Sequence, residues 1–168
     1  WTFLVGCIAI AGIPPFSGFF SKDEILTHAF AANPIYYIIG LLGALMTAFY
    51  MFRLYAMTFR GTFRGTQEQE HHLHESPWSM VIPLIILAVL AIVAGFVGIP
   101  ELFAPDAHRL EHYLAPVFDA SAKIAEGHHV PASTEWILLG VSIVMIAVSI
   151  LYALNRFSKK PETEEAVG

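Results

Sequence analysis

Three adjacent charged residues, Lys22, Asp23 and Glu24, follow twenty-one residues that carry no charge. An ionisable side chain inside an apolar segment is costly, and in membrane proteins it marks an ion or proton path. Burial among apolar neighbours weakens the hold of an amine on its proton, and a nearby carboxylate strengthens it. A lysine that moves between these two surroundings takes up and releases a proton. The pattern predicts proton transfer at Lys22.

Helical spacing separates the three charges. Successive residues of a helix project about 100° apart, so they face different directions, whereas residues four apart share a face. Asp23 therefore shares a face with Thr27, and Glu24 with His28. We expect Glu24 and His28 to continue a polar track towards the outer water.

Two adjacent prolines, Pro14 and Pro15, interrupt the segment that leads to Lys22. Proline removes a backbone donor and loosens a helix, which admits water and polar groups. Interrupted helices at membrane depth are tolerated where they line a polar cavity. We expect a discontinuous helix with its break near Pro14 and Pro15.

A different interpretation makes Lys22 an anchor. Its amine would reach along an apolar stem to the membrane surface, and Asp23 and Glu24 would cap the start of a helix whose N-cap is Ser21. Both interpretations hold if a second half-helix starts beside Lys22.

The composition predicts a membrane protein. Of the 168 residues, 56% are hydrophobic and only 14% are charged, against about 25% charged in soluble domains. The net charge is −5 and no basic patch occurs, so nucleic acid is not an expected partner, whereas the lipid bilayer is. The single cysteine, Cys7, is expected to be a small buried residue. Because the chain opens at Trp1 inside an apolar run, we expect a fragment of a larger subunit.

Four apolar segments are long enough to cross about 30 Å of hydrocarbon. They run from about 2 to 30 with a break near 14–15, from 34 to 59, from 80 to 99, and from 136 to 154. Continuous apolar runs without a period of two favour helices over strands. The predicted fold is all-α: a single polytopic membrane region with four transmembrane spans, the first of them discontinuous.

Basic residues predict the orientation of the spans. Arg53, Arg60 and Arg64 follow the second predicted span, and Arg156, Lys159 and Lys160 follow the fourth. Positive charge gathers on the cytoplasmic or matrix side. Lys22 then lies on a segment that runs from the inner side to the outer side.

Other motifs predict little chemistry. His71, His72 and His74 could bind a metal, but the neighbouring Glu and Gln residues favour a solvated loop, and we expect no metal site. The H-x-x-E-H match at 108–112 lies in too short a loop for a peptidase domain. The sequence contains no glycine-rich phosphate loop, catalytic triad or dinucleotide fingerprint, so we expect no cofactor bound to these residues alone.

Three stretches of sequence carry a family resemblance. They are AGIPPFSGFFSKDEIL at 11–26, LMTAFYMFRLYAMTFRG at 45–61 and HHLHESPWSMVIPLIILA at 71–88. In this order they resemble the antiporter-like subunits of respiratory complex I, in particular the distal type called subunit L in bacteria and subunit five in mitochondria. The resemblance implies that Lys22 serves proton exit on a broken helix, that Asp23 assists it, and that Pro14 and Pro15 form the break.

The resemblance also implies the wider setting. The chain would belong to a proton-translocating NADH:quinone oxidoreductase, with NADH, FMN, iron–sulfur clusters and quinone bound elsewhere in the complex. Its partners would be other membrane-arm subunits, notably the adjacent antiporter-like subunit. The expected location is the bacterial inner membrane in preference to the mitochondrial one.

Two alternatives stay open. Subunits of multi-subunit sodium/proton antiporters share the broken-helix fold and a similar lysine, although the residues after Lys22 and the TAFYMFRLY stretch look more like complex I. The other alternative is a membrane scaffold in which Lys22 only anchors the segment at the surface.

Overall fold

The computed structural model describes residues 1–60, 65–72, 74–97, 113–114, 116–117 and 130–158. Every regular element in this part of the chain is a helix. The elements are α1 (Thr2–Ala11), α2 (Ser17–Ala32), α3 (Pro34–Phe59), α4 (Gln67–His71), α5 (Trp78–Val93), the 3₁₀ helix η1 (Ala94–Val97) and α7 (Ala132–Phe157). The all-α prediction is therefore confirmed for the residues described.

Three helical segments are long and apolar enough to cross a membrane, judged by length and composition. They are α3, α5 together with η1, and α7. Helix α3 has the bounds predicted for the second span. The third segment begins at Trp78, two residues before the prediction, and the predicted end at 98–99 lies outside the described residues. Helix α7 extends beyond 136–154 at both ends.

The first predicted span is not one continuous helix. It is divided between α1, with 10 residues, and α2, with 16 residues, and neither is among the three long segments. The segment from Gly12 to Phe16 separates them and contains both Pro14 and Pro15. The interruption thus falls where the two prolines lie.

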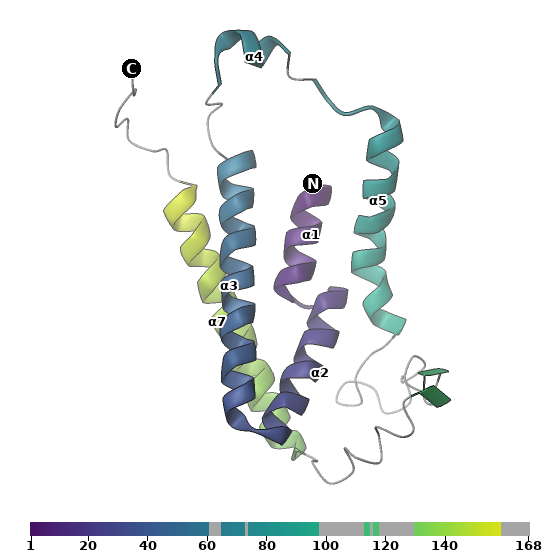
Figure 1. Cartoon of the computed structure of the whole chain (residues 1–168), viewed down its shortest axis with the longest axis vertical. Coiled ribbons are helices and arrows are strands. Elements are labelled where there is room, and N and C mark those ends of the chain that lie inside the picture. Colours follow the sequence, from purple (N-terminus) through teal and green to yellow (C-terminus); the bar gives the residue numbers. More distant parts are fainter. Residues whose placement is uncertain (61–64, 73, 98–112, 115, 118–129, 159–168) are drawn as a thin grey trace.

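The helices run up and down a bundle (Figure 1). α1 and α2 follow one another in one direction between α3 and α5, and α7 packs against α3. The C-terminal ends of α3 and α7 lie together, because Arg60 Nη1 donates a hydrogen bond to Ser158 Oγ at 3.5 Å. The basic ends of the second and fourth predicted spans, which the sequence analysis assigned to one side of the membrane, are therefore neighbours.

A single residue, Asn33, turns the chain from α2 into α3. Its side-chain oxygen accepts a hydrogen bond from the main-chain nitrogen of Ile35 at 2.9 Å, which caps the N-terminus of α3. Pro34 occupies the first turn, where its missing N–H has no helical partner to lose. This local chemistry explains why α3 begins where it does.

Small residues bring α1, α3 and α7 close together. Ala11, Ala48 and Ala153 are fully buried in one cluster with Cys7. Small side chains allow helix backbones to approach within van der Waals contact in a membrane. The expectation that Cys7 is buried is confirmed.

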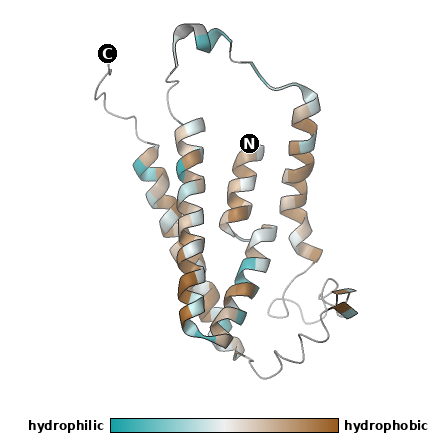
Figure 2. Cartoon of the chain, viewed as in Figure 1, coloured by the Kyte–Doolittle hydropathy of each residue, from teal (hydrophilic) through white to brown (hydrophobic). Residues whose placement is uncertain are grey.

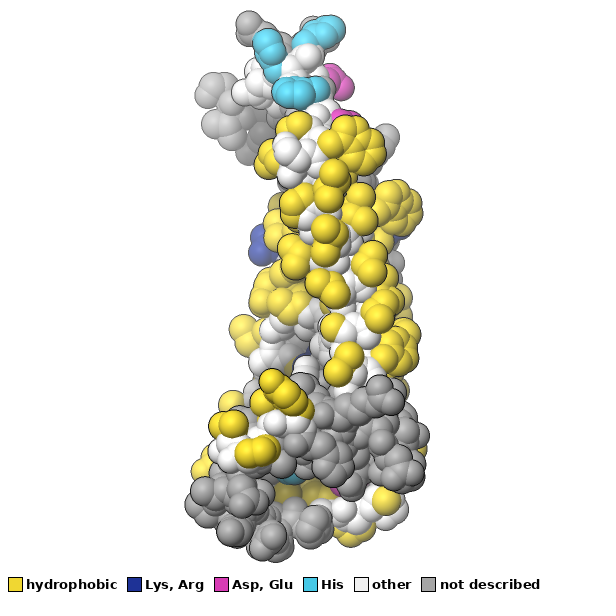
Figure 3. Space-filling model, turned by 90° about the vertical axis from the view of Figure 1, so that its right-hand side faces the viewer, with side chains coloured by type: hydrophobic (Ala, Val, Ile, Leu, Met, Phe, Trp, Pro, Cys, Tyr) yellow, Lys and Arg dark blue, Asp and Glu magenta, His cyan; other side chains and the backbone are white. Residues whose placement is uncertain are grey.

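The outer surface of the bundle is apolar. Helices α3, α5 and α7 are mainly hydrophobic, whereas α4 and the chain leading into α5 are hydrophilic, and a hydrophilic band crosses α2 (Figure 2). No residue of α5 is buried, and hydrophobic side chains cover its outer face (Figure 3). So large an apolar face is expected against lipid or other protein helices.

Candidate functional site

The C-terminus of α1 ends in a left-handed glycine. Gly12 has φ 75° and ψ 47°, a conformation that glycine adopts readily. Its N–H donates to the oxygen of Ala9 at 3.1 Å, and the N–H of Ile13 donates to the oxygen of Ile8 at 3.3 Å. This pair of bonds is a Schellman motif, which satisfies two of the last carbonyls of the helix. The carbonyls of Ile10 and Ala11 lie beyond its reach.

Lys22 supplies a donor for one of these carbonyls. Its Nζ atom donates a hydrogen bond to the main-chain oxygen of Ala11, across the interruption. The C-terminus of a helix carries a partial negative charge, which stabilises a cation. Among the residues that the structure describes, Lys22 makes no ion pair with a carboxylate. Its partner is the end of α1.

Helix α2 begins at Ser17, after Phe16 in an extended conformation and without a side-chain cap. The interpretation that Ser21 is the N-cap, with Asp23 and Glu24 in the first turn, is therefore wrong. Ser21 lies in the second turn, and the first turn holds no acidic residue. The helix starts as soon as the chain has passed Pro15, because prolines and the residues before them disfavour helical geometry.

Asp23 is the buried carboxylate of the site, with 8% of its surface exposed. It lies within electrostatic range of Glu135 in the first turn of α7 and of Tyr37 on α3. The Tyr37 hydroxyl donates to the main-chain oxygen of Leu138 at 3.2 Å, which links α3 to α7. Within the described part of the chain, the Asp23 carboxylate makes no hydrogen bond. The structure thus brings Lys22 and Asp23 to two different inner surfaces of α2.

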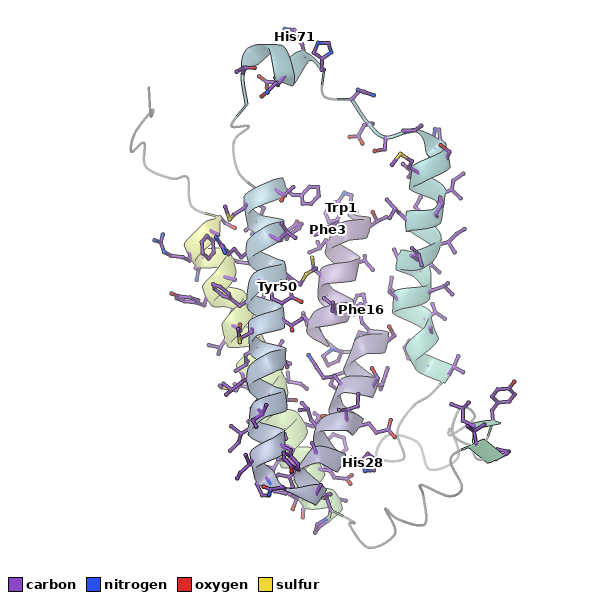
Figure 4. The ribbon with its side chains drawn as sticks, viewed as in Figure 1. Trp1, Phe3, Phe16, His28, Tyr50 and His71 are labelled. Carbon is purple, nitrogen blue, oxygen red and sulfur yellow. The ribbon has the colours of Figure 1, made fainter. Side chains whose placement is uncertain are left out.

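Glu24 and His28 lie on the exposed side of α2. His28 is near the C-terminal end of the helix, whereas Phe16 marks the junction of α1 and α2 (Figure 4). The structure therefore separates Glu24 and His28 from the buried Asp23. Their part in an outward polar track stays a prediction.

The sequence reasoning missed three parts of this site: the carbonyl end of α1, the role of Gly12 at that end, and the group formed by Tyr37 and Glu135. Gly12 carried a signal, since a glycine followed within two residues by proline is typical of a helix C-terminus. Glu135 also carried one, because it is the last charge before the uncharged run that opens at Trp136.

The histidines of the 71–74 segment are exposed. The ring Nδ1 of His74 lies 2.9 Å from the main-chain oxygen of His72. Within the described ranges, no three His, Cys, Asp or Glu side chains gather to hold a metal ion. The H-x-x-E-H match at 108–112 lies outside those ranges.

Residues 1–47 match a family described as NADH:quinone oxidoreductase/Mrp antiporter, transmembrane region. This stretch contains α1, the interruption, α2 with Lys22, and the first half of α3.

Three relatives of this chain are NAD(P)H-quinone oxidoreductase subunits. NAD(P)H-quinone oxidoreductase chain 5 of Picosynechococcus sp. is 42% identical over 89% of this chain and 24% of its own length. Subunit 5 of the organellar chromatophore of Paulinella chromatophora is 37% identical over 92% of this chain and 26% of its own length. The chloroplastic subunit 5 of Chaetosphaeridium globosum is 47% identical over 59% of this chain. The chain spans about a quarter of the length of the first two relatives.

Proposed function

The chain belongs to the antiporter-like subunits of NAD(P)H-quinone oxidoreductase, and from this premise we propose that it translocates protons, with Lys22 as the group that takes up and releases them. Electron transfer elsewhere in the complex would drive proton uptake and release at Lys22. NADH, FMN, iron–sulfur clusters and quinone are expected elsewhere in that complex, and no step at Lys22 involves them.

The contact between Lys22 and Ala11 is the observation that carries the proposal. A neutral carbonyl binds an ammonium less strongly than a carboxylate does. When the ammonium gives up its proton beside a carbonyl, the site becomes neutral, and no anion is left unpaired in the membrane. A carboxylate partner would leave such an anion, which is costly in an apolar environment. The end of α1 thus suits an amine that changes its charge.

We assign α1 and α2 together to one discontinuous transmembrane span, the first of four. At 1.5 Å per residue α1 is about 15 Å long and α2 about 24 Å. Each is shorter than the roughly 30 Å of hydrocarbon, whereas the two in succession exceed it. The direction of α1 and α2, opposite to that of α3, fits this assignment (Figure 1).

We propose that Asp23, next to Lys22 in sequence but on another inner surface of α2, is the assisting carboxylate, and that Glu24 and His28 lie on the outward path. Asp23 is buried between α2, α3 and α7, where a carboxylate can exchange a proton with trapped water. Pro14 and Pro15 keep the chain between the half-helices out of helical geometry, which leaves the carbonyl of Ala11 available to Lys22.

The proposed setting is a bacterial inner membrane, with the C-terminal ends of α3 and α7 on the cytoplasmic side. The proposed partners are the other membrane-arm subunits, notably the adjacent antiporter-like subunit, together with lipid. The exposed apolar face of α5 supports such partners, because none of its residues is buried within this chain.

The substitution Lys22→Ala in the full-length subunit tests the proposal. Inverted membrane vesicles report proton uptake, and the quinone reductase rate reports electron transfer. We expect fewer protons per electron pair, with the complex assembled in normal amount. A normal proton-to-electron ratio would contradict the proposal and leave Lys22 as an anchor.

A sodium/proton antiporter subunit is the second candidate, because the matching family description includes Mrp antiporters. In vesicles supplied with NADH as the electron donor and quinone as the acceptor, a proton pump responds to electron flow without added sodium. An antiporter instead moves protons when a sodium gradient is imposed and no electrons flow. Running both assays on the same vesicles separates the two candidates.

A further inference from the structure

We propose that Gly12 is a positioning residue for Lys22: by lacking a side chain, it allows the lysine amine to reach the carbonyl end of α1. This inference rests on the proposed function of Lys22 and deepens it. It assigns a second residue to the proton-transfer site, on the opposite side of the interruption.

The space that a side chain at position 12 would need is already occupied. A Cβ atom built on Gly12 would overlap the Cε and Nζ atoms of Lys22. The next atom is the main-chain oxygen of Gly18 at 3.4 Å, an ordinary contact distance. The conflict at Gly12 therefore concerns the end of the lysine and no backbone atom.

The atoms that an added Cβ would overlap show whether a glycine positions a side chain or allows two helices to pack. The end of a lysine side chain is flexible and moves aside at little cost to the fold. A residue other than glycine at position 12 would therefore spare the helices and displace the amine. Gly18 shows the opposite case, because a Cβ there would overlap the main-chain oxygen of Ala9. A substitution at Gly18 would push α2 away from α1.

The backbone conformation at Gly12 also disfavours substitution, because its φ of 75° is rarely adopted by residues with a side chain. Asparagine tolerates this left-handed conformation better than alanine. Gly12→Asn therefore relieves most of the backbone strain and still introduces a Cβ against Lys22. It serves as the second variant if Gly12→Ala assembles poorly.

Gly6 provides the matched control. It lies on α1, six residues before Gly12, and among the described residues a Cβ added there would meet no atom outside its own turn of helix within 4 Å. Gly6→Ala makes the same chemical change within α1, whereas Gly12 directly follows that helix, and it does not reach Lys22. Any effect common to Gly6→Ala and Gly12→Ala is thus a general effect of an added methyl group in or beside α1.

The experiment compares Gly6→Ala, Gly12→Ala, Gly12→Asn, Lys22→Ala and the double variant Gly12→Ala/Lys22→Ala in the full-length subunit within the complex. The amount of assembled complex, the quinone reductase rate and the protons moved per electron pair are measured for each. We expect Gly12→Ala and Gly12→Asn to lower the proton-to-electron ratio towards that of Lys22→Ala. We expect the double variant to equal Lys22→Ala, because coupled residues are not additive.

Each other outcome overturns the inference. If Gly12→Ala pumps like Gly6→Ala, Gly12 does not position the amine. If the loss appears again in the Lys22→Ala background, or if both Gly12 variants fail to assemble, Gly12 acts on the fold. If Lys22→Ala itself pumps normally, the proposed function is wrong. If Lys22→Ala pumps poorly but Gly12→Ala pumps normally, only the inference about Gly12 is wrong.

Discussion

Lys22 and Ala11 are joined by a hydrogen bond from the side-chain amine to the main-chain oxygen, across five residues that belong to neither helix. The bond links the C-terminus of α1 to the second turn of α2. The Schellman motif at Gly12 satisfies the earlier carbonyls of this terminus, so Ala11 retains an oxygen for the amine. The partner of the lysine is therefore supplied by the way in which the preceding helix ends.

The burial of Asp23 predicts a difference between two neighbouring carboxylates. We expect Asp23→Asn to lower the proton-pumping rate by about tenfold or more, since a positioned proton-transfer group contributes roughly 10²–10⁴-fold. Glu24→Gln, the matched control on the exposed side, is expected to have a much smaller effect. The measurement is the initial rate of proton uptake per assembled complex. Equal effects of the two substitutions would count against a special role for Asp23.

Glu135 is expected to act with Asp23, because the two lie in electrostatic range across α2 and α7. Glu135→Gln removes a negative charge near Asp23 and keeps the shape of the side chain. We expect the effects of Glu135→Gln and Asp23→Asn on the pumping rate to be non-additive in the double variant. Multiplication of the two single effects would show that Glu135 acts independently of Asp23.

The inside of the bundle allows a prediction about stability. Ala48 on α3 is fully buried among α1 and α7, and Ala48→Leu would insert three carbon atoms there. Overpacking of this kind typically costs about 1–3 kcal/mol. We expect a lower thermal midpoint of the solubilised complex and less assembled protein. The control is Val148→Leu on the exposed side of α7, and an equal loss there would argue against the close packing of α3 with α7.

The cap at Asn33 gives a second stability prediction. Asn33→Ala removes the oxygen that accepts from Ile35, and loss of such a cap costs about 0.5–2 kcal/mol. Asn33→Asp keeps an acceptor at the same place and should retain most of the stability. The two variants are compared by thermal unfolding. If aspartate is as harmful as alanine, the cap is not what holds the start of α3.

Much of the fold was predictable because it depends on local sequence. The uncharged runs predict helices. Asn33 followed by Pro34 is a helix-start signal that can be read directly from the sequence, and it defines the start of α3. Pro14 and Pro15 likewise predict the interruption, because proline disfavours helical geometry locally. Such features need no knowledge of what lies across the bundle.

The site was less predictable because it depends on contacts between distant parts of the chain. Helical spacing assigns Asp23 and Glu24 to different faces, but only the packing of α3 and α7 decides that Asp23 is the buried one. The stretch Ser21–Glu24 has the residues of a helix start, yet α2 had already begun at Ser17. The pairing of Lys22 with Ala11 follows from the path of the chain through the interruption, which spacing alone does not give.

The most direct measurement is the number of protons moved per electron pair by complexes that carry Lys22→Gln or Lys22→Arg. Glutamine keeps an N–H donor, on a side chain one atom shorter, but does not take up a proton, and arginine keeps its proton at every physiological pH. We predict that both variants assemble and reduce quinone, and that both move fewer protons per electron pair than the unmodified complex. An unchanged ratio in either variant would contradict the claim that the amine of Lys22 carries the proton.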